Sequence, residues 1–153
     1  MNQEVKLKAT ELIASTERAA FLQDRDRQSE VTQSEMAKFW AAMVPLVQDT
    51  NYALKGWYEL DLMTAGSIKL RYIGDSRTIT ALNVKFLNTG KLVLDITHTS
   101  EKGEWALRMV DVDSFSWQTQ GKEGPIKAVA EDSLLWFLDR SIAQLASNKI
   151  IVR

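Results

Sequence analysis

The sequence predicts an α+β domain in which two N-terminal helices precede an antiparallel β-meander or partly closed barrel of six to seven strands, followed by a C-terminal helix. Two hairpins built on one loop pattern carry this prediction, together with helical spacing of apolar residues on either side of them. We expect a single domain over 1–153, with a helical segment at 1–50, the sheet at 56–119 and the C-terminal helix at 126–148.

The N-terminal segment divides into two predicted helices. Residues 3–28 carry a thin, alanine-rich stripe at helical spacing, formed by Val5, Ala9, Leu12, Ala19 and Leu22. The charged run at 24–27 has no apolar face, so we expect the first helix to end there. Thr32 and Glu35 match a capping box, which predicts the start of a second helix. Its apolar stripe is stronger, and consists of Met36, Phe39, Trp40, Met43 and Val47. Pro45 is expected to kink or shorten it.

The first hairpin is predicted from a three-residue loop at 64–66, whose glycine suits a left-handed backbone. Pairing Met63 with Ser67 sets apolar residues opposite one another on one face, as Leu62–Ile68, Leu60–Leu70 and Tyr58–Tyr72. On the other face it sets Glu59 opposite Arg71 and Asp61 opposite Lys69. A slip of one residue would place charges among leucines, so the pattern determines the register.

The second hairpin repeats the pattern around the loop at 88–90. Pairing Leu87 with Lys91 gives the apolar pairs Phe86–Leu92, Val84–Leu94 and Leu82–Ile96. The buried face of this third strand changes side near 80–82, which predicts a bulge. Alternation continues at 105–109 and 115–117, where we expect two further strands.

The C-terminal part is predicted to be a polar loop followed by a helix. The loop covers 118–125, and 126–129 is either a short seventh strand or the lead-in to the helix. The core stripe of that helix is expected to be Leu134, Phe137, Leu138, Ile142 and Leu145. The apolar tail at 150–152 is a candidate edge strand.

Composition argues against several classes of function. The net charge of −1 lacks the basic excess typical of nucleic-acid binding, so we expect no nucleic-acid partner. With no cysteine, thiol catalysis and zinc–thiolate sites are excluded, and a reducing cytoplasm is the expected location. The N-terminus lacks the apolar region of a secretion signal. No run of apolar residues is long enough to span a membrane, so we expect no membrane insertion.

Candidate catalytic groups have simpler structural interpretations. His98 is the only histidine, and the sequence brings no nucleophile to it, so we interpret it as structural. Asp95, Asp111 and Asp113 lack the spacing of a calcium loop. Glu59 and Asp61 have predicted cationic partners, which disfavours a general-acid role. We therefore expect no enzyme activity, no cofactor and no metal.

The leading functional hypothesis is a non-catalytic protein-interaction module of the adaptor, assembly-factor, chaperone or inhibitor type. Its partner would be another protein or a second copy of the chain. The residues expected to bind this partner are Trp57, Trp40 and Phe39. Trp57 alternates with the core set of the first hairpin, and Phe39 and Trp40 are adjacent on a helix that cannot bury both fully. Tryptophan is enriched as an anchor at interfaces.

The alternative hypothesis is a carrier of a small apolar ligand, held between the sheet and the C-terminal helix. Tyr72, Phe86, Trp105 and Met109 would line the site, and His98 would be its polar anchor. The order of strands followed by a helix containing Trp136 resembles pleckstrin-homology-type barrels and helix-grip carriers. This resemblance concerns topology alone, because no sequence motif accompanies it.

Overall fold

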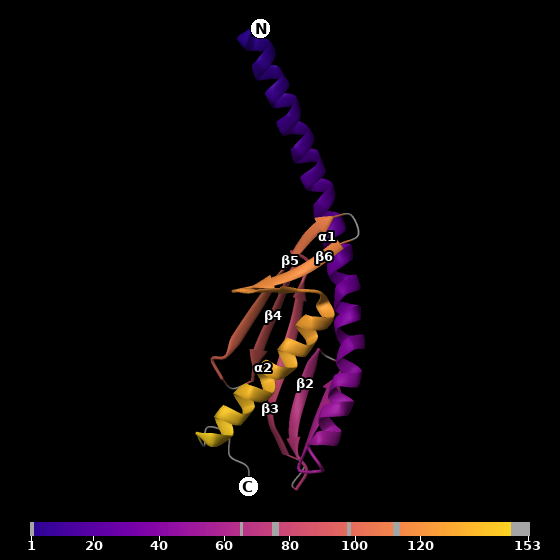
Figure 1. The fold of residues 1–153 in the computed structure, drawn as a ribbon, viewed down its shortest axis with the longest axis vertical. Coiled ribbons are helices and arrows are strands. Elements are labelled where there is room, and N and C mark those ends of the chain that lie inside the picture. The colour runs from indigo at the N-terminus through magenta and orange to yellow at the C-terminus, as the bar shows by residue number, and fades with distance from the viewer. Residues whose placement is uncertain (1, 65, 75–76, 98, 112–113, 148–153) are drawn as a thin grey trace.

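The computed structural model describes residues 2–64, 66–74, 77–97, 99–111 and 114–147. Two helices, α1 (Gln3–Ala53) and α2 (Ile126–Ala146), flank seven strands in the chain (Figure 1). The strands are β1 (Tyr58–Met63), β2 (Ser67–Tyr72), β3 (Arg77–Leu87), β4 (Lys91–Ile96), β5 (Lys102–Asp111), β6 (Ser114–Thr119) and β7 (Lys122–Gly124). The predicted α+β class is confirmed.

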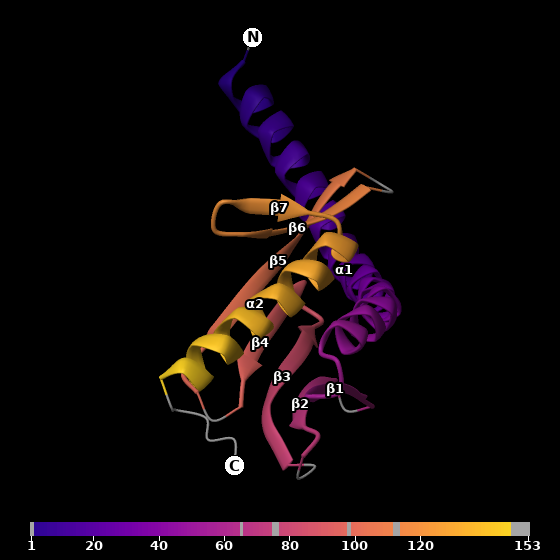
Figure 2. The same cartoon turned by 60° about the horizontal axis from the view of Figure 1, so that its bottom comes forward.

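The sheet is an antiparallel meander in which every strand pairs with its neighbours in the chain, in the order β1 to β7. β1 and β7 stand at opposite edges, so the sheet is open and does not form a closed barrel. Both helices pack on one face of it (Figure 2), while the other face carries mainly polar side chains. The molecule therefore has one helical layer and one sheet layer around a single core.

Both predicted hairpins have the predicted register. β1 pairs with β2 from Met63–Ser67 to Tyr58–Tyr72, and β3 pairs with β4 from Leu87–Lys91 to Leu82–Ile96. Gly66 and Gly90 adopt φ values of +82° and +80°, the left-handed conformation that three-residue loops require. The expected irregularity in β3 is also present, as a register shift opposite Leu70 and Arg71.

The two predicted N-terminal helical segments are joined in one continuous helix of 51 residues. The capping-box interpretation was wrong, because the Thr32 hydroxyl donates to the Gln28 carbonyl oxygen at 2.6 Å, inside the helix. Such a bond to the preceding turn lets threonine stay in a helix interior. α1 also continues through Pro45, where the buried side chains of Met43 and Val47 hold the flanking turns against the core.

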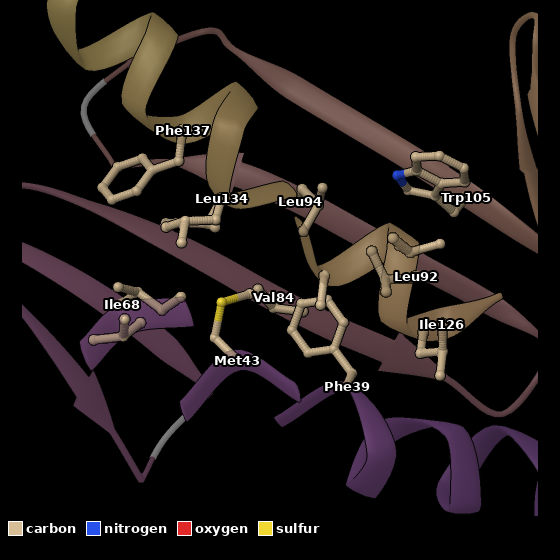
Figure 3. Close-up of a cluster of buried hydrophobic side chains, with 14 of the residues drawn as sticks. Phe39, Met43, Ile68, Val84, Leu92, Leu94, Trp105, Ile126, Leu134 and Phe137 are labelled. Carbon is tan, nitrogen blue, oxygen red and sulfur yellow. The ribbon is translucent and has the colours of Figure 1, made fainter. Parts of the chain in front are cut away.

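The core lies between the helices and the sheet (Figure 3). Phe39 and Met43 of α1 and Phe137 of α2 are fully buried there. The core also contains an acid, since Glu35 is 4% exposed and its Oε1 accepts a hydrogen bond from Nε1 of Trp117 at 3.2 Å. This bond joins α1 to β6 across 82 residues of sequence.

The C-terminal part differs from the prediction in two ways. The polar loop contains a short strand, β7, whereas Ile126 begins the helix, which is one of the two alternatives predicted for 126–129. On α2, Ile142 is 66% exposed and Ser141 is buried in its place. The Ser141 hydroxyl donates to the Phe137 carbonyl at 2.8 Å, so a small polar side chain is satisfied within the helix itself. Residues 150–152, the candidate edge strand, lie outside the described residues.

The outer edge of β1 is covered by a side chain of α1. Asn51 accepts a hydrogen bond from the Leu60 backbone N–H at 2.7 Å and donates one to the Leu60 carbonyl at 3.0 Å. The amide group thus forms the pair of bonds that a neighbouring strand would form. Covering an edge in this way hinders pairing with other chains.

Candidate functional site

The N-terminal half of α1 is exposed at every position from Gln3 to Glu17. We call residues 3–26 the arm. Figure 1 shows it projecting beyond the sheet, and the helix meets the sheet at Gln28, whose side chain lies against the turn at Gly90. Every side chain from Gln3 to Glu17 is exposed. Four of these are large and apolar, and their exposed fractions are 56% for Val5, 62% for Leu7, 70% for Leu12 and 61% for Ile13.

One side of the arm carries only uncharged residues in the sequence. At 100° per residue, a helical sector of about 120° contains none of the charged residues of the arm, while some uncharged residues, such as Leu7, also lie outside it. We call this set the stripe; its members with described side chains are Val5, Ala9, Leu12, Ile13, Thr16 and Ala20. The Thr16 hydroxyl donates to the Leu12 carbonyl at 2.8 Å, so its polar group is turned to the helix backbone.

The stripe lies on the side of α1 opposite to the side that packs on the sheet. Leu12 precedes the buried Phe39 by 27 residues, which is about seven and a half turns. The same separation relates Thr16 to the buried Met43. A partner on the stripe would therefore approach α1 from the side away from the protein's own sheet.

A second apolar surface lies where α1 ends. Tyr52 is 89% exposed, Trp57 is 66% exposed and Ile73 is 39% exposed. A shallow depression of about 320 Å³ there is lined by Trp57, Tyr72 and Ile73 among others. The Trp57 carbonyl accepts a bond from the Ile73 N–H at 3.0 Å, which fixes the two segments together. We call Tyr52, Trp57 and Ile73 the corner.

The structure separates the three residues expected to bind a partner. Trp57 is on the surface, at the corner. Phe39 is fully buried, so it belongs to the core and cannot contact a partner. Trp40 is partly buried against Phe39, with ring centroids 5.1 Å apart, and it borders an apolar groove of about 530 Å³ beside Met36, Val44 and Met63.

The residues expected to hold an apolar ligand do not surround one space. Tyr72 stacks at a tilt on Tyr58 at the end of the first hairpin, while Phe86 packs edge-on against Phe39 and Trp117. Trp105 is buried opposite Leu92, and Met109 pairs with Phe115 near the far end of β5. His98 lies outside the described residues.

The polar sheet face holds ion pairs rather than a free acid pair. The Arg71 guanidinium lies 2.8 Å from Glu59 and 3.2 Å from Asp61, so both carboxylates share one cation. On the next strands the Asn83 amide donates to Asp95 at 2.7 Å. Within the described part of the chain, no group of three acidic or histidine side chains is placed to hold a metal ion. Asp113 and the Asp111 side chain are outside that part.

Sequence reasoning missed two features of the surface and core. The sequence predicted that Val5, Ala9 and Leu12 share one helix face but not that this face is exposed, because periodicity shows which residues share a face and not what covers it. The buried position of Glu35 was hidden by its match to a capping box. Only the continuity of α1 shows that Leu12 and Phe39, which are 27 residues apart, lie on opposite sides of one helix.

Comparison with known proteins gives no relative: no family model, curated protein or solved structure matches this chain. Among the described residues, no helix is both long and apolar enough to cross a membrane.

Proposed function

We propose that this protein is a non-catalytic interaction protein of the adaptor, assembly-factor, chaperone or inhibitor type, and that the arm is its main binding surface. The observation that carries the proposal is the stripe, which is exposed and faces away from the protein's own sheet. The lack of cysteine fits a reducing cytoplasm, where we expect the protein to act.

Energetics favour a partner on the arm. Most of the stability of a helix in a protein comes from packing of its apolar face, and the arm has no such packing from Gln3 to Glu17. Burying a leucine or isoleucine side chain contributes about 1.5–3 kcal/mol relative to leaving it in water. A helix or groove laid along Val5, Leu12 and Ile13 would recover this free energy, as in other helix-mediated recognition.

The corner is a second proposed contact. Trp57 has the exposure and residue type of an interface anchor, and Ile73 lines the same depression. Ala20 of the stripe and Tyr52 of the corner are 32 residues apart, about 48 Å along α1, so a small partner would contact one surface and not both.

The carrier hypothesis has less support. Val129 and Phe137 of α2 are fully buried and Leu134 is 4% exposed, so side chains already fill the interface between this helix and the sheet. A ligand there would have to displace them. We retain the carrier as an outcome of the test below.

The test is isolation from the source cells followed by native mass spectrometry, using the intact chain, Leu12→Glu and Leu7→Glu. The two leucines are similarly exposed, but Leu7 lies on the side of the arm away from the stripe. We expect a protein complex with the intact chain and with Leu7→Glu, and its loss with Leu12→Glu.

Thermal unfolding of the three proteins separates binding from folding, because neither leucine contributes to the core. Equal midpoints are expected. A monomer with nothing bound in all three preparations would refute the proposal. A bound small molecule would replace it with the carrier.

A further inference from the structure

We infer that the partner of the arm is a second copy of the chain, and that the two arms pair as antiparallel helices about a twofold axis near Leu12. This inference rests on the proposed role of the arm as a binding surface and names what binds it.

The shape of the stripe favours pairing with itself in reverse. Antiparallel arms centred between Leu12 and Ile13 place Val5 beside Ala20 of the other copy, and Ala9 beside Thr16. The large side chains then meet at the centre, and each valine faces a small residue. Because Thr16 turns its hydroxyl to the Leu12 carbonyl, its methyl group is left for the contact. An isologous twofold contact of this kind is the commonest form of oligomer.

The charges that border the stripe favour the antiparallel direction. Lys6 and Glu17 are 11 residues apart, about three turns, so they lie on the same flank of the arm. In an antiparallel pair each flank meets the same flank of the partner, which brings Lys6 within about half a turn of the partner's Glu17, twice by symmetry. A parallel pair would instead bring Lys6 beside Lys8 of the other copy, because Lys8 lies on the opposite flank.

The rest of the molecule leaves room for this pairing. In each copy the stripe and the core-facing residues are about half a turn apart around the axis of α1. The sheet therefore lies on the side of α1 that faces away from the other copy. The last stripe residue with a described side chain is Ala20, and Gln28, whose side chain lies against the turn at Gly90, is about 12 Å further along the helix. Two copies therefore approach through their arms without contact between their sheets.

Engineered cysteines test the direction, because the chain has no cysteine of its own. In an antiparallel pair Leu12→Cys lies near the twofold axis and is expected to cross-link to itself with a short bis-maleimide. Val5→Cys is not expected to cross-link to itself, but it should cross-link to Ala20→Cys when the two variants are mixed. Self-cross-linking of Val5→Cys would show parallel arms and overturn the inference.

Sedimentation equilibrium of the purified chain gives the dimer dissociation constant and the role of the charges. Lys6→Glu should weaken the dimer about fivefold, because two weak ion pairs become two repulsions. Lys6→Glu combined with Glu17→Lys should restore it, since the pairs re-form with their signs exchanged. Leu7→Glu is the matched control and should leave the dimer unchanged.

The outcomes separate this inference from the proposed function. A dimer with the expected cross-links and charge rescue supports the inference. An intact chain that is monomeric at tens of micromolar, or a dimer that Leu12→Glu leaves unchanged, overturns it. Neither of these two results refutes binding of a different protein by the arm, which the complex isolated from the source cells tests independently.

Discussion

Replacing Asn51 by alanine should destabilise the protein by uncovering the edge of β1. The Asn51 side chain makes two hydrogen bonds, at 2.7 and 3.0 Å, to the backbone of Leu60, a residue that is 2% exposed. Each bond contributes about 1 kcal/mol, and leaving a buried N–H or C=O without a partner costs at least as much. We therefore expect a loss of about 2 kcal/mol in the free energy of unfolding.

Urea and thermal unfolding measure this loss. For a domain of this size, 2 kcal/mol corresponds to a fall of about 4–8 °C in Tm. Hydrogen exchange adds a local readout, because the Leu60 amide should lose protection more than amides in β4. Asn51→Asp keeps the acceptor for the Leu60 N–H and loses the donor, so a smaller amide-exchange effect is expected.

The neighbouring Tyr52, which is 89% exposed, provides the control. Tyr52→Ala should leave Tm unchanged. A change of less than about 0.5 kcal/mol in Asn51→Ala would refute the reasoning, because it would show that water satisfies the β1 edge as well as the amide does.

Three further predictions concern the core, the corner and the end of the sheet. Trp117→Phe removes the donor to the buried Glu35 carboxylate and should lower the free energy of unfolding by about 2–3 kcal/mol in urea titration, and a loss below 1 kcal/mol would contradict it. Trp57→Ala should weaken partner binding in pull-down experiments and leave cooperative unfolding intact, whereas loss of cooperativity would assign Trp57 to the core. The Ser116 hydroxyl lowers the pKa of Glu123, so Ser116→Ala should raise this pKa toward its usual value in an NMR titration. Because the pKa of Glu123 is lowered in the folded state, its contribution to the free energy of unfolding is present above the unfolded pKa and is lost as the pH falls through the folded pKa. A Glu123 titration that is unchanged in Ser116→Ala would contradict this assignment.

The two hairpins could be predicted from sequence because the residues that determine each one lie close together in the chain. Gly66 and Gly90 fix the loops, and alternation makes any slipped register bury charge, so the observed pairs follow directly. The exposure of Trp57 follows in the same way, since it directly precedes β1 and alternates with the core-facing residues of that strand.

The continuity of α1 could not be predicted, because a capping box resembles ordinary helix interior in sequence. Thr32 is compatible with both, and the choice depends on the packing of Phe39 and Glu35 against the sheet. The burial pattern of α2 likewise could not be predicted from the sequence. Ser141 is buried and Ile142 is exposed because the direction of approach of the helix decides which face is covered, and hydrophobicity alone does not report that direction.

Because α1 is one continuous helix, it fixes the distance and the rotation about the helix axis between a partner bound to the arm and the sheet. Each residue inserted between the stripe and Gln28 would move the sheet about 1.5 Å along the helix axis and rotate it by about 100°. Two inserted residues would turn the core-facing side by more than half a turn, whereas seven would nearly restore it at a distance about 10 Å greater. Residue count in this short segment thus determines which way the polar sheet face is presented to a bound partner.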